Sequence, residues 1–98
     1  HYGENELKLF SYYEKVNRMR RNKDPDLKQL SDIFSILCEK YPKDWLLGLE
    51  IYELIYRKKN DELTEKVQAH LEKLSANPSY KNLIQDGIQL LHKELSNN

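Results

Sequence analysis

Residues 44–56, DWLLGLEIYELIY, form the segment that most constrains how this chain can fold. Written as an α-helix, the segment is apolar around most of its circumference. Its two internal carboxylates, Glu50 and Glu53, are three residues apart and share one narrow stripe. A helix of this kind has to be covered on several sides, yet it is too short to cross a bilayer, which takes about 20 apolar residues. The segment therefore predicts a buried central helix in a small helical domain.

Length, charge and cysteine content narrow the class of protein. Ninety-eight residues support one domain, since single domains commonly have about 100–150 residues. Lys and Arg equal Asp and Glu in number, so no net charge favours binding to nucleic acid or to a membrane surface. Cys38 is the only cysteine, which excludes an internal disulfide and a zinc site built from several thiolates. We expect a cytoplasmic domain and, because it begins at His1 without an initiator methionine, one excised from a longer protein.

Apolar residues recur at helical spacing in four further segments. Asp24-Pro25 and Asn77-Pro78 each combine a favoured N-cap residue with proline at the first helical position, so both pairs predict helix starts. Tyr41-Pro42 predicts a helix end, because the residue before proline resists helical geometry. We expect one domain over residues 1–98, with a flexible N-terminal segment over 1–5 and helices over 6–22, 25–41, 44–58, 61–75 and 78–95.

Short joints between these segments place consecutive helices antiparallel. The predicted fold class is all-α, either a compact bundle of about five antiparallel helices or a stack of helical hairpins. Tyr12 and Tyr13 are adjacent aromatic residues that cannot both point inward, so we interpret them as a possible partner contact. The periodic apolar faces supply the predicted core: Trp45, Leu46, Leu49, Tyr52, Leu30, Phe34, Leu37, Val67, Leu71, Ile84, Ile88 and Leu91.

The sequence shows no catalytic or metal-binding constellation. His1, His70 and His92 are far apart, whereas a metal site takes clustered ligands, and an approach of His70 to His92 across a hairpin would be incidental. Cys38 lies beside an apolar face near a helix end, which favours a buried structural thiol over a nucleophile activated at a helix N-terminus. We expect no catalytic residue, no cofactor-binding residue and no metal ligand.

The charged positions fit structural roles as well. Glu50 and Glu53 would need a desolvated cleft to act as acid and base, so we expect a solvent-facing stripe or an ion pair with a neighbouring helix. Four cations near the end of the first helix complement the partial negative charge of a helix C-terminus and predict a solvated helix end rather than a ligand site: Arg18, Arg20, Arg21 and Lys23.

Three stretches resemble parts of one known family. Residues 41–55, YPKDWLLGLEIYELI, resemble the C-terminal extension of the long bacterial aromatic amino acid hydroxylases, which are phenylalanine 4-hydroxylase-like enzymes dependent on tetrahydrobiopterin and non-haem iron. Residues 16–21, VNRMRR, are similar to the V-x-x-x-R run that opens this extension, and residues 83–91, LIQDGIQLL, are similar to its closing helix. The resemblance covers nearly the whole chain. No catalytic H-x-x-x-H motif matches, so no iron or pterin ligand is assigned here.

The resemblance implies a non-catalytic C-terminal helical domain of a monooxygenase, serving docking, oligomerisation or regulation. Its partner would be the catalytic domain of the parent chain or a second copy of itself, with neither nucleic acid nor membrane involved. Iron and tetrahydrobiopterin would belong to the parent enzyme and not to this part of it. The alternative is a free-standing helical-hairpin module for protein–protein interaction. A small enzyme that uses His70 or His92 is the least favoured hypothesis.

Overall fold

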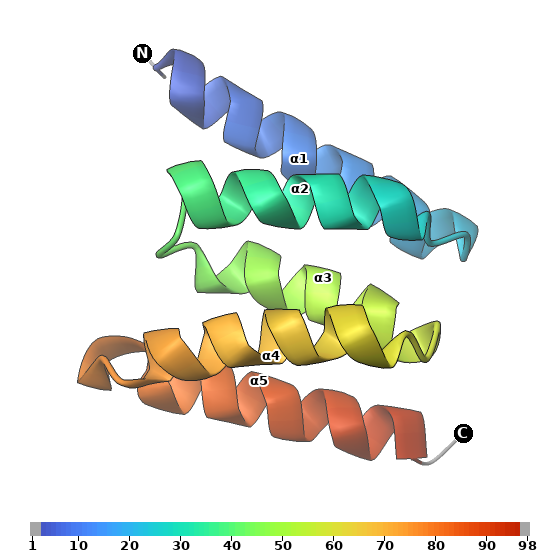
Figure 1. Cartoon of the computed structure of the whole chain (residues 1–98), viewed down its shortest axis with the longest axis vertical. Coiled ribbons are helices and arrows are strands. Elements are labelled where there is room, and N and C mark those ends of the chain that lie inside the picture. Colours follow the sequence, from blue (N-terminus) through green and yellow to red (C-terminus); the bar gives the residue numbers. More distant parts are fainter. Residues whose placement is uncertain (1–2, 97–98) are drawn as a thin grey trace.

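The computed structural model describes residues 3–96, and the side chains of all of these except residues 4, 5, 95 and 96. The described chain consists of α1 (Glu4–Asn22), α2 (Leu27–Lys40), α3 (Trp45–Arg57), α4 (Asp61–Ser75) and α5 (Pro78–Ser96). The helices follow one another in chain order down the molecule, from α1 at the top of Figure 1 to α5 at the bottom. Residues 3–96 contain no β-strand, and the predicted all-α class is confirmed.

The helices begin and end within two residues of the predicted positions, and local capping explains the differences. α1 begins at Glu4 instead of residue 6, and the Glu6 carboxylate accepts a hydrogen bond from the Gly3 backbone N–H. Part of the predicted flexible segment, residues 1–2 with His1, lies outside the described residues. α2 begins two residues later than predicted, because Asp26 is its N-cap and accepts from the Gln29 N–H.

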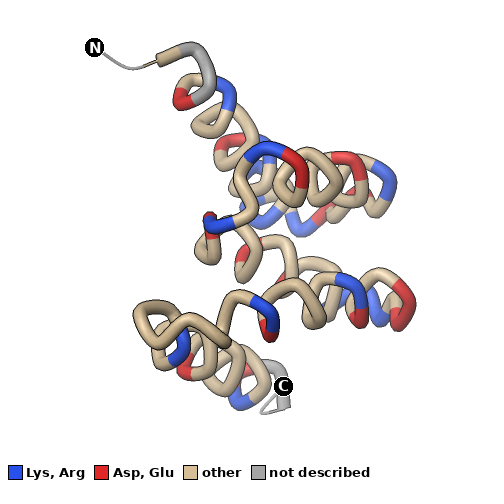
Figure 2. The backbone as a smooth tube through the Cα atoms, turned by 60° about the vertical axis from the view of Figure 1, so that its left-hand side comes forward, with Lys and Arg blue, Asp and Glu red and all other residues tan. Residues whose placement is uncertain are grey.

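α3 is the central helix, as predicted, because it packs against each of the other four described helices. Contacts also join helices that are next but one in sequence, namely α1 with α3, α2 with α4, and α3 with α5. The arrangement is therefore a stack of helical hairpins, with α1, α3 and α5 as neighbours on one side and α2 and α4 on the other. Figure 2 shows acidic and basic residues interspersed along the helices, in keeping with their equal numbers.

Two glycines allow the close approach of α3 to its neighbours. A Cβ atom at Gly48 would lie 3.0 Å from a methyl carbon of Leu71 on α4. A Cβ atom at Gly87 on α5 would lie 2.8 Å from a methyl carbon of Leu49. The missing side chains thus let the buried leucines of α3 and α4 fill the space between the helices.

The predicted core is mostly observed, with one error. Leu46 is 46% exposed. It lies near the start of α3 on the same helical stripe as Glu50 and Glu53, and α1, which contacts those two residues, inclines away from the stack toward its own N-terminal end (Figure 1). Trp45, Ile88 and Leu91 are only partly buried and pack against the outside of the core. The remaining predicted core residues are buried: Leu30, Phe34, Leu37, Leu49, Tyr52, Val67, Leu71 and Ile84.

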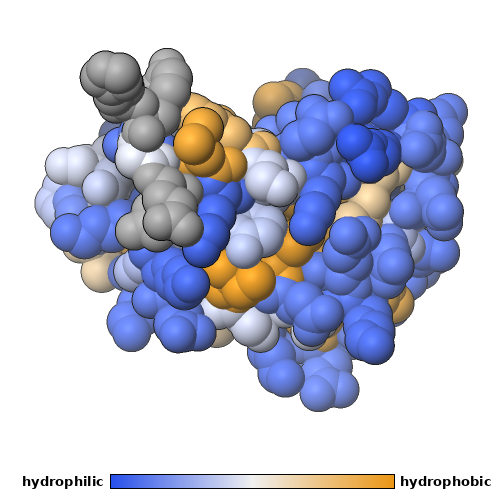
Figure 3. All heavy atoms as spheres, turned by 90° about the horizontal axis from the view of Figure 1, so that it is seen from above, coloured by the Kyte–Doolittle hydropathy of each residue, from blue (hydrophilic) through white to orange (hydrophobic). Residues whose placement is uncertain are grey.

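Seen from the α1 side, the surface is mostly hydrophilic, with a group of apolar side chains near the middle of the face (Figure 3). The exposed large apolar residues of the described chain all belong to α1, α3 or α5 and not to α2 or α4: Leu7, Phe10, Leu46, Tyr56, Leu83 and Leu90. Among the described helices, none combines the length and the apolar character that a membrane crossing requires.

Candidate functional site

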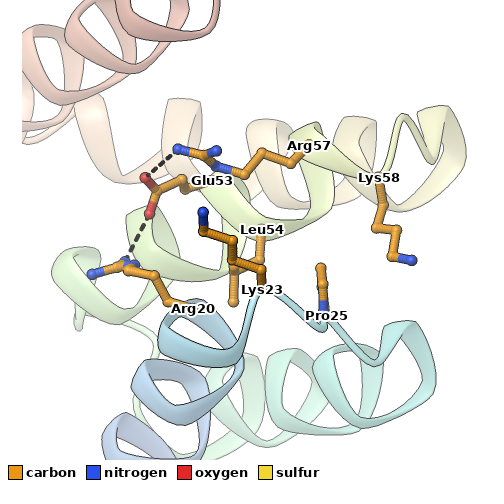
Figure 4. A pocket seen from close by; sticks show the side chains of 7 residues that line it. All are labelled: Arg20, Lys23, Pro25, Glu53, Leu54, Arg57 and Lys58. Atoms are coloured by element: carbon orange, nitrogen blue, oxygen red, sulfur yellow. Dashed lines mark hydrogen bonds and ion pairs between the residues drawn. The ribbon is translucent and has the colours of Figure 1, made fainter.

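Charged side chains of α1 and α3 meet where the two helices pack together. Arg20 Nη2 lies 2.9 Å from Glu53 Oε2, and Arg20 Nη1 lies 3.8 Å from Glu50 Oε1. Arg57 Nη2 approaches the second oxygen of Glu53 at 3.5 Å, so two guanidinium groups hold one carboxylate (Figure 4). The side chains of Glu50 and Glu53 are only 17% and 13% exposed. Of the two alternatives predicted for Glu50 and Glu53, the ion pair with a neighbouring helix is therefore confirmed, and the solvent-facing stripe is not observed.

Burial makes the charge on Glu50 unfavourable. Its Oε2 atom is buried without a hydrogen-bond partner within the described residues. Burial raises the pKa of the Glu50 carboxyl above its ordinary value, and the carboxylates of Glu53 and Asp44 raise it further. The neighbouring Arg20 guanidinium acts in the opposite direction and lowers the pKa. Arg20 thus helps to keep a half-buried carboxylate ionised.

Tyr12 and Tyr13 are both partly buried and pack against the core. The Tyr13 hydroxyl donates a hydrogen bond to Asp44 Oδ1, and the Tyr12 ring meets Tyr41 edge-on at 6.5 Å. Burial first, and then the hydrogen bond to Asp44, raises the pKa of Tyr13 above its ordinary value. The premise that only one of the two rings can reach the core is therefore wrong. Their role as a partner contact stays a prediction.

Asp44 joins the start of α3 to α1, and its removal should affect both. Its Oδ1 atom accepts from the Leu47 N–H at 3.0 Å as well as from Tyr13. We expect Asp44→Ala to lower the free energy of unfolding by about 2–3 kcal/mol, because a cap and a side-chain hydrogen bond are both lost. Asp26→Ala, which removes only the cap of α2, should cost about 1 kcal/mol, and urea titrations of the two variants measure both losses. Equal losses in the two variants would contradict the double role of Asp44.

A pocket opens where the C-terminal ends of α1 and α3 meet the turn into α2. Its volume is about 460 Å³. The pocket has an apolar part formed by Leu54 and Pro25, and Lys58 extends from the end of α3 at the edge of the pocket, with its ammonium group directed away from Leu54 (Figure 4). The lining residues are Arg20, Lys23, Pro25, Glu53, Leu54, Arg57 and Lys58.

The pocket has a positive electrostatic balance. Arg20 and Arg57 are engaged with Glu53, whereas neither Lys23 nor Lys58 has an ion-pair partner within the described residues. The ends of α1 and α3 each contribute about half a negative charge. The four cations of the lining carry more charge than the negative groups near them, which are Glu53, Glu50 and the two helix ends. The pocket can bind an anionic group. It contains no His or Cys that could act as base or nucleophile.

The prediction that the basic end of the first helix is simply solvated is incomplete. Arg18 and Arg21 are exposed and contact Glu14 on the same helix, at 3.6 Å and 3.3 Å, as a solvated helix end would. Arg20 and Lys23, in contrast, turn toward α3 and line the pocket. The signal in the sequence was a second cationic helix end at residues 57–59, but its proximity depends on how α1 and α3 align in space.

Cys38 and His70 are near one another but do not form an activated pair. Cys38 is exposed, so the predicted buried thiol is wrong; it lies on the flank of α2 next to the buried Leu37. Its Sγ atom is 3.8 Å from His70 Nδ1. Partial desolvation by its neighbours raises the pKa of the Cys38 thiol although the residue is exposed, and burial lowers the pKa of His70, so both groups favour their neutral forms. A nucleophilic thiolate needs the opposite shift of the thiol pKa.

His92 is directed toward α3 and not toward His70. The hydroxyl of Tyr52 lies 2.8 Å from His92 Nε2, and the ring of Tyr56 is 5.0 Å from the imidazole ring. His70 instead meets the ring of Phe34 on α2 at 5.7 Å. Within the described part of the chain, no group of three or more His, Cys, Asp or Glu side chains is placed to hold a metal ion.

The basic pocket between α1 and α3 is thus a candidate site for a ligand. Its lining suits an anionic group next to an apolar one. Comparisons of this chain with family models, with curated proteins and with solved structures find no match.

Proposed function

We propose that this chain is a non-catalytic helical interaction domain that binds an acidic polypeptide segment in the pocket between α1 and α3. The observation that carries the proposal is a pair of ammonium groups, Lys23 and Lys58, that have no ion-pair partner among the described side chains and line a pocket of about 460 Å³ whose arginines are already held by Glu53. Free ammonium groups at such a site favour a ligand that brings its own carboxylate.

The lining favours an acidic side chain over a phosphate group. Arginine recognises phosphate through its planar, bidentate fork, but the forks of Arg20 and Arg57 face Glu53. Leu54 and Pro25 offer apolar contact to the methylene groups of a glutamate or to an apolar neighbour in its sequence. A chain without net charge also has no overall electrostatic attraction for nucleic acid.

Residues 41–55 resemble the C-terminal extensions of aromatic amino acid hydroxylases, and this resemblance suggests which protein would contain the acidic segment. In that case this chain is the C-terminal accessory domain of a cytoplasmic phenylalanine 4-hydroxylase-like monooxygenase, and the pocket docks it on the catalytic domain, which would hold the iron and the tetrahydrobiopterin. The same pocket also serves a free-standing interaction module. In both cases the domain acts by binding.

Charge reversal in the pocket tests the proposal. A fluorescein-labelled peptide of twelve residues, rich in glutamate, is titrated with the protein at low salt, and binding is followed by fluorescence anisotropy. We expect the double variant Lys23→Glu/Lys58→Glu to weaken binding by about tenfold or more, since each charge contributes on the order of 0.5–1 kcal/mol.

The matched control has the same net charge but an intact pocket. Lys81→Glu/Lys93→Glu alters two exposed lysines of α5 and should change binding by less than about threefold, through long-range attraction alone. An equal loss in the control, or no binding of the peptide by the unaltered protein, would refute the pocket as the binding site.

A further inference from the structure

The carboxylate of Glu53 occupies the place in the pocket where a ligand would meet both arginines. Its two oxygens are engaged separately: Oε2 lies 2.9 Å from Arg20 Nη2, and Oε1 lies 3.5 Å from Arg57 Nη2 (Figure 4). The side chain of Glu53 is only 13% exposed, so little water competes for these contacts. Arg20 comes from the last turn of α1 and Arg57 from the last turn of α3. Glu53 is therefore a resident carboxylate ligand that joins two cationic helix ends.

The resident carboxylate also sets the charge that the pocket accepts. Four cations line the pocket, and they are opposed by Glu53, by Glu50 and by the partial charges of two helix ends. These groups leave a balance of about one positive charge. A glutamate side chain brings one negative charge, whereas a phosphorylated serine brings about 1.5–2 negative charges. The pocket therefore neutralises one carboxylate but leaves part of the charge of a phosphate uncompensated.

The geometry of the contacts favours the same ligand. A guanidinium group recognises phosphate through parallel N–H donors in a planar fork, whereas an ammonium group acts as a point charge. Both forks of the lining are turned toward Glu53, which leaves Lys23 and Lys58 for a ligand. Glu50 does not have this double role, because it contacts Arg20 at 3.8 Å and is not a lining residue.

From these contacts we infer that Glu53 is the specificity-determining residue of the pocket. By holding both arginines, it admits a single carboxylate and discriminates against a phosphorylated segment. This inference rests on the proposed function and adds the selectivity of the same site. Its consequence is that phosphorylation of the acidic partner segment does not strengthen docking.

A pair of matched peptides tests the inference. The glutamate-rich peptide of twelve residues is compared by anisotropy at low salt with a peptide in which one central glutamate is replaced by phosphoserine. The unaltered protein should bind the phosphopeptide no more than about twofold more tightly than the glutamate peptide. Glu53→Gln removes the charge that holds both forks, so it should strengthen binding of the phosphopeptide about tenfold or more and of the glutamate peptide less than about threefold.

Two control variants separate the arginine forks from net charge. Glu50→Gln removes an equal charge beside the pocket while Glu53 keeps both arginines, so it should strengthen both peptides by a similar small factor and leave the ratio of their affinities unchanged. Glu53→Gln/Arg57→Gln has the net charge of the unaltered protein but lacks one fork, so most of the gain for the phosphopeptide should disappear.

A further variant keeps the test decisive if circular dichroism shows that Glu53→Gln does not fold. Glu53→Asp keeps the charge but is one methylene shorter, so its carboxylate cannot bridge both arginines as Glu53 does. It should strengthen binding of the phosphopeptide about threefold relative to the glutamate peptide. An unchanged ratio in a folded Glu53→Asp variant would refute the inference.

The outcomes distinguish this inference from the proposed function. Loss of glutamate-peptide binding in Lys23→Glu/Lys58→Glu, together with a ratio of affinities that Glu53→Gln leaves unchanged, would refute the role of Glu53 and retain the pocket. A gain for the phosphopeptide that Glu50→Gln reproduces, or that persists without Arg57, would assign the preference to net charge and also refute this role. A clear preference of the unaltered protein for the phosphopeptide would overturn the inference. Binding of neither peptide would refute both proposals.

Discussion

Replacing Tyr52 by alanine should lower the free energy of unfolding by about 3–5 kcal/mol, the largest loss expected from any single change in this domain. Tyr52 is 1% exposed and is the largest fully buried side chain of the described chain. It lies on α3, where a cavity would be shared with neighbouring helices, and its hydroxyl contacts His92 on α5. Urea unfolding followed by circular dichroism measures the loss, with an unchanged m-value showing that only stability has changed.

The free energy of unfolding of a small domain is only about 5–15 kcal/mol in total, so Tyr52→Ala could fail to fold. Two further variants test the prediction in that case. Tyr52→Phe keeps the ring and removes the hydrogen bond to His92, and should cost about 1 kcal/mol. Tyr56→Ala removes a ring that is 37% exposed and one turn away, and should cost clearly less than Tyr52→Ala. Similar losses for the two alanine variants would mean that α3 is not enclosed as described.

Replacing Arg20 by glutamine should lower the free energy of unfolding by about 1–2 kcal/mol at neutral pH. The change leaves Glu50 without its cationic partner and Glu53 with Arg57 alone. Losing one partner of a partly buried ion pair is costly because the remaining charge stays desolvated, although water screens Arg20, which is 40% exposed, and reduces the loss. Arg18→Gln is the matched control and should cost less than about 0.5 kcal/mol, since its pair with Glu14 is fully on the surface.

The loss in Arg20→Gln should depend on pH. The folded state already binds a proton on Glu50 more tightly than the unfolded state does, because burial raises the pKa of this carboxyl. That raised pKa lowers stability at neutral pH, and the lost stability returns as the pH falls through the folded pKa toward the ordinary value. Without Arg20 the pKa of Glu50 rises further, so the difference in stability between the variant and the unaltered protein should shrink as the pH falls from neutral toward the ordinary pKa of a glutamate. A difference that is constant or grows on acidification would contradict this role of Arg20.

The central helix and most helix ends could be predicted from the sequence because their signals are local. The nearly uninterrupted apolar run of residues 45–55 determines that α3 is covered, and Pro42 and Pro78 fix neighbouring boundaries through backbone geometry. The Asp24-Pro25 pair predicted the start of α2 at residue 25, and this prediction was wrong, because Asp26 and not Asp24 caps the helix. The choice of Asp26 moved the start of this helix by two residues.

Exposure at the edges of α3 could not be predicted, because it depends on the angles between helices. Leu46 lies on the same stripe as Glu50 and Glu53, and that stripe is covered by α1 only toward its C-terminal end. Trp45, the first residue of α3, is only partly buried, so Tyr52 and not the tryptophan is the main aromatic residue of the core. Apolar character alone does not show which side of an all-round apolar helix stays uncovered.

The pocket depends even more on tertiary structure. Lys23 and Lys58 are 35 positions apart in the sequence, and each taken alone is an ordinary cation at a helix end. They line one pocket because α1 and α3 run in the same direction and end at the same level, a result of the α1–α2–α3 hairpin order. The binding proposal therefore requires α1 to pack on α3. That packing in turn requires α3 to be the central helix, which contacts each of the other helices.

Amide hydrogen exchange tests most directly whether α3 is the enclosed central helix. If α3 is enclosed by the other helices, the amides of residues 51–55 should exchange only through global unfolding, with a protection free energy equal to the one from urea unfolding. The amides of residues 8–10, in the inclined and more exposed start of α1, should exchange through local opening at a much lower free energy. Exchange of residues 51–55 that is as fast as that of residues 8–10 would contradict the central position of α3.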